Sequence, residues 1–330
     1  MAFLKKYRPA LTVALLVTAL LVTARSMARF DILLFDRLGP GLGWVQIAGA
    51  AALGFWLTGK YLDPKSAPRW RRRTWLLFSG VFFGQLLLGL TVSPMFLMTG
   101  KLHFPIPMVI EGGAIYRAEW AFMPILFLST ILLSGPAWCS QLCYMGGCDL
   151  NRARAGRDFR SFSGAIRHRW RFRLGAVALV ATVAVLLRLL GAPLWLVTAL
   201  VVLWGVTGWL LVLFLSPRKR QMIHCNLFCP MGAIVSLLKW VNPTRLRFNR
   251  ERCTRCMRCA RACPHAAISP KDLELGRPAL NCTLCGDCHA VCPHGAVEYR
   301  FLGLAPSRAR TVYLTIVLTL YVTFLMLARI

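Results

Sequence analysis

The chain has 330 residues, of which 57% are hydrophobic and 16% charged, and 40 Lys and Arg residues against 12 Asp and Glu give a net charge of +28. Soluble globular proteins carry about 25% charged residues and are less apolar, so this composition excludes an ordinary soluble enzyme and also a disordered chain. The apolar residues form long blocks, which favours a membrane protein over a nucleic-acid-binding protein.

Seven apolar segments are long enough to cross a bilayer, because a hydrocarbon core about 30 Å thick needs about 20 helical residues. The segments at 75–98 and 193–216 contain no charged residue. The segment at 10–26 is predicted to be an uncleaved helix, since Arg25 and Arg29 stand where small residues would mark signal-peptide cleavage. The expected spans are residues 10–26, 42–59, 75–98, 119–135, 174–190, 193–216 and 311–328.

The basic residues give these spans a direction, because Lys and Arg are retained on the cytoplasmic side. With the N-terminus inside, the predicted cytoplasmic segments hold 33 Lys and Arg residues and the outer segments hold six. Residues 30–37 alternate apolar and charged side chains, which predicts a short interfacial helix. We therefore expect a multi-pass protein of a prokaryotic inner membrane that contacts anionic lipid and has no nucleic-acid partner.

Eight cysteines form two copies of one motif. Residues 253–264 and 282–293 both read Cys-x2-Cys-x2-Cys-x3-Cys-Pro. This doubled run is typical of bacterial ferredoxins with two 4Fe-4S clusters, in which the cysteine before proline serves the other cluster. The expected ligand sets are Cys253, Cys256, Cys259 and Cys292 for the first cluster, and Cys282, Cys285, Cys288 and Cys263 for the second.

Other uses of these cysteines fit the pattern less well. Zinc needs two cysteine pairs per metal rather than a tight triplet followed by Cys-Pro, and disulfides do not suit a cytoplasmic module. Residues 285–289 match the c-type haem motif, but both cysteines belong to the stronger ferredoxin pattern. Since no histidine lies on a predicted span, a b-type haem is not expected either, and the sequence predicts no haem.

Four further cysteines form a second repeat. Cys139 and Cys143 follow the fourth predicted span, Cys225 and Cys229 follow the sixth, and both pairs read Cys-x3-Cys-x-Met-Gly. Both spans should end on the cytoplasmic side, so the four thiols could meet there and hold a third cluster or a softer metal such as copper(I), with Cys148 as a candidate fifth thiol. Alternatively, they are buried small apolar side chains without a metal.

This combination of spans, paired Cys-x3-Cys motifs and a two-cluster module over roughly residues 75 to 300 resembles the membrane polyferredoxins of bacterial respiration. These include the NapH-type quinol dehydrogenase components and the related NosR-type and FixG/CcoG-type proteins. The chain departs from them at Tyr144, where the family usually has proline, and by two extra helices before the shared part and one after it. The NapH-type resemblance implies quinol oxidation, with electrons passed through the clusters to a partner.

Two alternatives to this function stay open. The FixG/CcoG-type resemblance implies a cupric reductase or metallocentre assembly factor, with the Cys-x3-Cys pairs binding the metal. The chain could also serve as a membrane anchor and electron wire for an enzyme subunit, without a substrate site of its own. Quinol-dependent cluster reduction would favour the first function, and copper binding through Cys139 or Cys225 would favour the second.

A quinol site needs an apolar slot and a proton acceptor near a cluster, which predicts a pocket beside the Cys-x3-Cys motifs. Gln141, Tyr144 and His224 are the polar residues there, and His224 could accept the quinol proton because its ordinary pKa is near neutrality. Alternatively, His224 is a solvated side chain. A second cluster of polar residues between the third and fourth spans is interpreted as a solvated outer loop: Glu111, Tyr116, Arg117 and Glu119.

Arginines surround the first predicted cluster, where they would steer an acidic redox partner or contact anionic lipid: Arg245, Arg247, Arg250, Arg252, Arg255, Arg258 and Arg261. We expect an all-α polytopic bundle of about seven membrane helices, N-terminus cytoplasmic, with a small α+β two-cluster ferredoxin-like module. The expected segments are 1–216 with six helices and the first Cys-x3-Cys pair, 217–244 with the second pair, 245–303 with the ferredoxin module, and 304–330 with the last helix.

Overall fold

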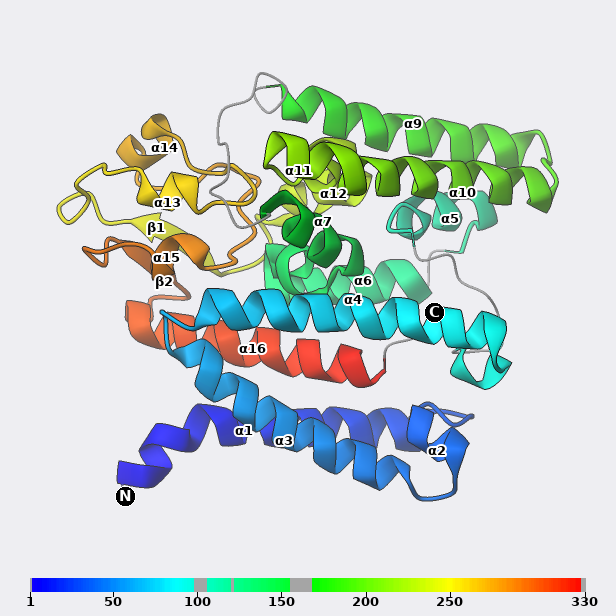
Figure 1. Cartoon of the computed structure of the whole chain (residues 1–330), viewed down its shortest axis with the longest axis horizontal. Coiled ribbons are helices and arrows are strands. Elements are labelled where there is room, and N and C mark those ends of the chain that lie inside the picture. The colour runs from blue at the N-terminus through cyan, green and yellow to red at the C-terminus, as the bar shows by residue number, and fades with distance from the viewer. Residues whose placement is uncertain (1, 98–105, 120–121, 155–167, 328–330) are drawn as a thin grey trace. The chain divides into compact units, whose positions relative to one another are not determined.

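The computed structural model of the chain describes residues 2–97, 106–119, 122–154 and 168–327 (Figure 1). Within these residues, six helices are long and apolar enough to cross a membrane, which identifies a multi-pass membrane protein. Their bounds are Tyr7–Met27, Ala67–Thr91, Pro124–Leu142, Arg169–Leu189, Leu194–Lys219 and Pro306–Met326.

The second predicted span forms a helix that is not among these six. Helix α3 (Gly43–Leu62) has 20 residues, which is long enough to span, but it contains four glycines together with Gln46 and Lys60 and is therefore less apolar. The third predicted span also differs, because α4 (Ala67–Thr91) ends well before residue 98 and is followed by the 3₁₀ turn η1 (Pro94–Phe96).

The chain divides into two compact units, Met1–His103 with Tyr299–Ile330, and Phe104–Glu298. The four consecutive segments expected from the sequence stay a prediction. The last helix returns to the first helices, and the ferredoxin module belongs with the middle helices that carry the Cys-x3-Cys pairs.

The first unit consists of α1 (Ala2–Met27), α2 (Leu34–Leu38), α3, α4, η1 and α16 (Pro306–Met326). Helices α1, α3 and α16 pack against one another, and Gly54 on α3 permits a close approach, since a Cβ there would lie 3.1 Å from Val13 Cγ1. The short helix α2 lies in the segment expected to be interfacial, and its Asp36 accepts two hydrogen bonds from Arg25, at 2.8 and 2.9 Å.

Polar contacts join α4 and α16 to the end of α3 in this unit. The Tyr61 and Thr74 hydroxyls are 2.6 Å apart, and the Tyr321 hydroxyl donates to the Thr74 carbonyl at 2.7 Å. The Arg310 guanidinium donates to the carbonyls of Tyr61 and Leu62 at 2.7 and 2.8 Å, which satisfies two of the carbonyls that a helix end leaves unpaired.

The second unit begins with α5 (Val109–Arg117) and α6 (Phe122–Ser134). The 3₁₀ turn η2 (Gly135–Ala137) and the π turn η3 (Trp138–Leu142) extend α6, so the fourth span runs past residue 135. Helices α7 (Tyr144–Arg154), α9 (Arg169–Leu189) and α10 (Leu194–Leu210) follow in that order. The π turn η4 (Leu211–Leu215) and α11 (Ser216–Lys219) then lead to the π turn η5 (His224–Phe228) and α12 (Pro230–Leu238).

The ferredoxin module follows α12 along the chain. It contains β1 (Arg245–Phe248), the short helices α13 (Arg258–Arg261), α14 (Pro270–Glu274) and α15 (Asp287–Ala290), and β2 (Val297–Arg300). The two strands pair in a two-stranded sheet. Because so little regular structure holds the module together, its shape depends on the loops that carry the cysteines.

Candidate metal centres

The two ferredoxin motifs fold into the same loop. Arg255 and Leu284, which precede the second cysteine of each run, have φ values of 54° and 55°, and Met257 and Gly286, which follow that cysteine, have φ values of 59° and 83°. A left-handed conformation costs a non-glycine residue roughly 1 to 2 kcal/mol. Such turns direct backbone N–H groups toward a common point, where an anionic centre can bind.

Each loop brings three cysteines to a cavity that the other motif completes. One cavity is lined by Cys253, Cys256, Cys259 and Cys292. The other is lined by Cys282, Cys285, Cys288 and Cys263. The structure thus brings together the two sets of four cysteines that the spacing predicts, with one cysteine crossing over in each direction.

The crossing cysteines are held alike. The Cys263 sulfur accepts a hydrogen bond from the Ala267 amide and the Cys292 sulfur one from the Ala296 amide, both at 3.3 Å. Burial raises the pKa of Cys263 to about 12, so its free thiol is neutral at pH 7. Iron must therefore displace a proton when it binds here.

The cavity lined by Cys253, the cluster 1 cavity, lies near the protein surface. Cys256 is exposed, and hydrogen bonding led by the backbone amide of Arg258 lowers its pKa. Cys259 is buried, and burial raises its pKa to about 11. The cavity lined by Cys282, the cluster 2 cavity, is the more enclosed one, since three of its four cysteines are buried.

The two Cys-x3-Cys motifs also share one backbone geometry. Their second cysteines close the π turns η3 and η5: the Cys143 amide donates to the Trp138 carbonyl at 3.0 Å, and the Cys229 amide to the His224 carbonyl at 2.9 Å. Both cysteines have a ψ of 116° and immediately precede an α-helix, α7 or α12. The three-residue spacing therefore fits one π turn that ends in a helix N-terminus.

Helix amides face both of these sulfurs. Burial raises the pKa of Cys143 to about 12, although hydrogen bonds from the backbone amides of Gly146 and Met145 lower it. The amides of Gly232 and Met231 do the same for Cys229. Each second cysteine is thus prepared for the thiolate form by the first turn of the following helix. The geometry is shared even though Tyr144 takes the place of Pro230.

The four cysteines of the two motifs line one cavity, which we call the four-cysteine cavity: Cys139, Cys143, Cys225 and Cys229. Cys148 does not line it. Among the described residues, no three His, Cys, Asp or Glu side chains are grouped closely enough to hold a single metal ion. In each of the two ferredoxin sets and in the Cys-x3-Cys set, the four cysteines instead surround a cavity.

A buried arginine lines the four-cysteine cavity. Arg173 on α9 is 3% exposed and donates to the Cys225 carbonyl at 2.7 Å, the Asn226 carbonyl at 3.0 Å and the Ser236 hydroxyl at 3.3 Å. A buried guanidinium requires compensating negative charge, because removing it from water is costly. Four thiolates around a bound metal centre would supply that charge. This role is not predictable from the sequence, because Arg173 is one of several basic residues near the start of its span.

A buried carboxylate connects the two motifs. Asp149 on α7 is fully buried and accepts hydrogen bonds from the Ser216 hydroxyl at 2.5 Å and the Cys225 amide at 3.0 Å. It therefore holds the helix that follows the first motif against the turn that carries the second. Sequence reasoning also missed this residue, although a chain with 12 acidic residues offers few candidates.

The cluster 2 cavity and the four-cysteine cavity share lining residues. His265 and Thr283 line both of them. The Thr283 hydroxyl is buried without a hydrogen-bond partner among the described residues, which fits a site whose occupant completes it. Two hydrogen bonds hold the module at this boundary. The Ser140 hydroxyl donates to the Thr283 carbonyl at 3.0 Å, and the side-chain amide of Asn226 donates to the Pro264 carbonyl at 3.3 Å.

His224 is buried rather than solvated, so the solvated alternative is wrong. It is 4% exposed and lines a fourth cavity, which we call the His224 cavity. This cavity shares Cys229 and Pro107 with the four-cysteine cavity. The other two predicted quinol-site residues, Gln141 and Tyr144, do not line it.

The segment between the third and fourth spans is not simply a solvated loop. Glu111 on α5 is partly buried, and one of its carboxylate oxygens lacks a partner among the described residues. The Tyr116 hydroxyl donates to the Ala192 carbonyl at 3.0 Å. The exposed ion pair of Arg117 and Glu119, at 3.1 Å, fits the expectation of a solvated loop. Helix α5 packs against α9, and this packing explains the burial.

The apolar helices and the cysteine-lined cavities together define the class of an iron-sulfur membrane protein. Residues 246–269, which include the first ferredoxin motif, match the family of 4Fe-4S binding domains (Fer4). Searches of curated proteins and of solved structures return no significant match. The Fer4 match supports an electron-transfer role based on iron-sulfur chemistry.

Proposed function

We propose that the protein passes electrons between the membrane quinone pool and a redox partner. Two 4Fe-4S clusters would occupy the cluster 1 and cluster 2 cavities, and a third metal centre the four-cysteine cavity. Each cluster accepts one electron, whereas a quinol releases two electrons and two protons when it becomes a quinone. Several one-electron carriers in series can take up the two electrons of a quinol one after the other.

The observation that carries this proposal is the order of the cavities. The cluster 2 cavity shares His265 and Thr283 with the four-cysteine cavity, which in turn shares Cys229 with the His224 cavity. At the other end, Cys259 of cluster 1 lies close enough to Cys288 of cluster 2 to affect its pKa. Neighbouring sites therefore adjoin along the whole series, as an electron-transfer chain requires.

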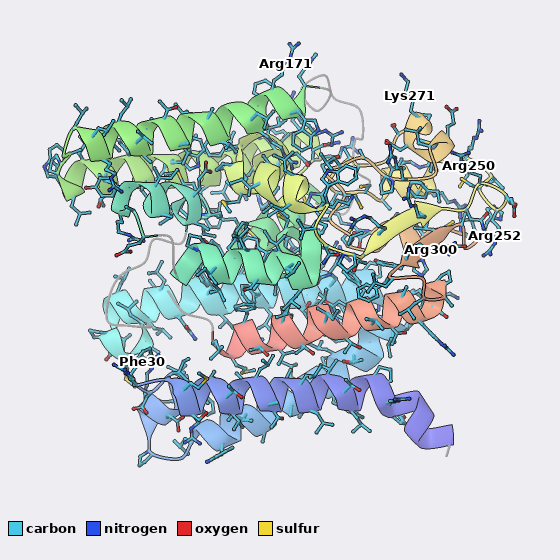
Figure 2. The ribbon with its side chains drawn as sticks, turned by 180° about the vertical axis from the view of Figure 1, so that it is seen from behind. Phe30, Arg171, Arg250, Arg252, Lys271 and Arg300 are labelled. Carbon is cyan, nitrogen blue, oxygen red and sulfur yellow. The ribbon has the colours of Figure 1, made fainter. Side chains whose placement is uncertain are left out.

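The surface around cluster 1 is the natural place for a redox partner. Cys256 is exposed there, and Arg250 and Arg252 project outward, as does Lys271 from the same module (Figure 2). Some of this charge is neutralised within the module, because Arg252 pairs with Glu298 and Arg255 with Glu274, both at 3.6 Å. The remaining positive charge supports an acidic partner, whose encounter would be accelerated at low ionic strength.

The distribution of basic residues supports a cytoplasmic position for the ferredoxin module and the N-terminus in a prokaryotic inner membrane, with α3 as a seventh span. Reporter fusions at both ends test this arrangement. With seven spans the two ends lie on opposite sides, and with six they lie on the same side. Reporters on the same side would contradict the seven-span topology.

The function is tested by low-temperature EPR and iron analysis of anaerobically purified protein, reduced with dithionite or with a quinol analogue. Reduction by quinol with about twelve iron atoms per chain supports the proposal in full, since each 4Fe-4S cluster contributes four. About eight iron atoms would leave the four-cysteine cavity to another metal or to none. Clusters that dithionite reduces and quinol does not would contradict a quinol dehydrogenase.

Copper provides the contrasting outcome at the four-cysteine cavity. Its thiols could also bind copper(I), which prefers soft sulfur ligands. The Cys139→Ser variant distinguishes the two metals: loss of about four iron atoms per chain indicates a cluster, whereas loss of bound copper with unchanged iron indicates the metal-handling function. Cys148→Ser is the matched control, because Cys148 does not line the cavity.

A further inference from the structure

The His224 imidazole is enclosed without a partner. Its side chain is buried, and neither ring nitrogen has a hydrogen-bond partner among the described residues. A buried polar group that makes no hydrogen bond destabilises the fold, because it has lost the water it would otherwise bind. Since the ring lines the His224 cavity, a ligand in that cavity with a hydroxyl or carbonyl group could supply the missing bond.

The walls of this cavity suit a flat ring. Trp204 and Trp209 of α10 line it, and the Trp204 ring stacks on Phe228 with centroids 4.2 Å apart and planes 25° from parallel. The remaining lining is almost entirely apolar and includes Met108, Met145 and Pro230. Aromatic walls around one hydrogen-bonding group are typical of small-molecule sites, in which the polar group fixes the orientation.

Two glycines on α10 make room for this site. A Cβ on Gly208 would lie 2.9 Å from the His224 ring, and a Cβ on Gly205 would collide with the Ile106 side chain. Ile106, Pro107 and Met108, which directly precede α5, line the cavity and close one side of it.

We propose that the His224 cavity binds the ring of a quinone or quinol, with Trp204 and Trp209 against the ring and the His224 imidazole hydrogen-bonded to a ring oxygen. This inference rests on the proposed function and locates its substrate. A ring bound here would lie directly beside the Cys229 wall of the four-cysteine cavity. The site thus places the electron donor or acceptor next to the first metal centre.

The experiment compares His224→Leu and Trp204→Leu with the native protein in two measurements. One is the rate at which a short-chain ubiquinol and a short-chain menaquinol reduce the clusters, and the other is photo-crosslinking by an azido-substituted short-chain quinone. We expect a roughly tenfold loss of quinol reduction in His224→Leu, because it removes the hydrogen bond to the ring, and a loss in Trp204→Leu, because it removes a wall of the site. Both variants should also lose crosslinks to residues that line the cavity. Reduction by dithionite and the iron content should stay native.

His224→Leu separates a ligand role from a structural one. Removing a buried imidazole that makes no hydrogen bond should leave thermal stability unchanged or raise it, because no pairing is lost. The matched controls are His168→Gln and Trp195→Leu, which change an exposed histidine and an exposed tryptophan at the start of α10. In both controls, quinol should reduce the clusters at the native rate and the azido-quinone should crosslink to the same residues as in the native protein.

The failures of the two proposals differ. If neither quinol reduces the native protein while dithionite does, the proposed function fails. If quinol reduces the native protein and His224→Leu equally well, or if crosslinks map outside the cavity, the site is elsewhere and only this inference is overturned. A preference between the two quinols identifies a benzoquinone or a naphthoquinone as the ring.

Discussion

Cys143 and Cys229 occupy the same position in two copies of one turn. Each donates its amide to the carbonyl five residues earlier, at 3.0 and 2.9 Å, and each stands directly before an α-helix whose first amides face its sulfur. The two copies come from separate spans, yet they bring their cysteines to one cavity together with Cys139 and Cys225. This internal repeat supports a shared ligand role.

The crossed arrangement of the ferredoxin cysteines predicts an unusual mutational result. Cys292→Ser should disrupt the cluster of Cys253, Cys256 and Cys259, although Cys292 belongs to the second motif, because the four side chains line the same cavity. Cys263→Ser should disrupt the other cluster. EPR of the two variants checks this, provided the Cys256→Ser and Cys285→Ser spectra first identify each cluster. A Cys292→Ser spectrum that matches Cys285→Ser would contradict the crossing.

Arg173 should tune the centre in the four-cysteine cavity. Replacing it with Gln removes the buried positive charge beside three of these cysteines, so the added electron is less stabilised and the reduction potential should fall. Arg173→Lys keeps the charge but not the three hydrogen bonds. Its reduction potential should therefore lie between those of the native protein and Arg173→Gln. Potentiometric titration followed by EPR measures the change. Arg171→Gln is the control, because Arg171 on the same helix projects outward (Figure 2), and an equal shift there would refute a local effect.

Asp149 should be needed for the two Cys-x3-Cys motifs to stay together. Asp149→Ala leaves the Ser216 hydroxyl and the Cys225 amide unpaired in a buried site, which should destabilise the fold by about 2 to 4 kcal/mol. Asp149→Asn retains a hydrogen-bond acceptor, so it should lose less stability than Asp149→Ala. Thermal unfolding and iron content measure both effects, and the two ferredoxin clusters should survive in Asp149→Asn. An Asp149→Ala protein with native stability and full metal content would contradict this role.

Glu111 should make stability depend on pH. Burial raises the pKa of its carboxyl to about 7, so the folded protein binds this proton more tightly than the unfolded chain. The corresponding stability is present at low pH and is lost as the pH rises through about 7. Glu111→Gln should therefore stabilise the protein at pH 8, by roughly 1 kcal/mol after allowance for solvent exposure, and this gain should shrink toward pH 5.5.

The pH test for Glu111 is a comparison of melting temperatures in the same detergent across that range. Glu119→Gln is the control, because Glu119 lies in an exposed ion pair on the same segment. A gain for Glu111→Gln that does not change with pH would show that burial of the charge is not its cause. A loss of stability at pH 8 would contradict the prediction outright.

Short-range features of this chain were predictable from the sequence. A charge-free run such as residues 193–216 indicates a span because length and apolarity alone decide whether a helix crosses a bilayer. Helix ends were less predictable, since α10 continues through a π turn to Lys219 and α6 through two turns to Leu142. Gly135, with a φ of 59° and no room for a Cβ beside Asn242, shows how tertiary contact sets such an extension.

The sequence by itself determined the chemistry of the protein, because cysteine spacing fixes which ligands a short loop can offer to a cluster and apolar runs fix the solvent that surrounds a helix. Only the tertiary structure decided which distant groups meet. Arg173, Asp149 and Thr283 join the cysteine sites through contacts between separate elements, and the residues just before α5 reach the His224 cavity. Such contacts depend on packing between elements, which local pattern does not encode.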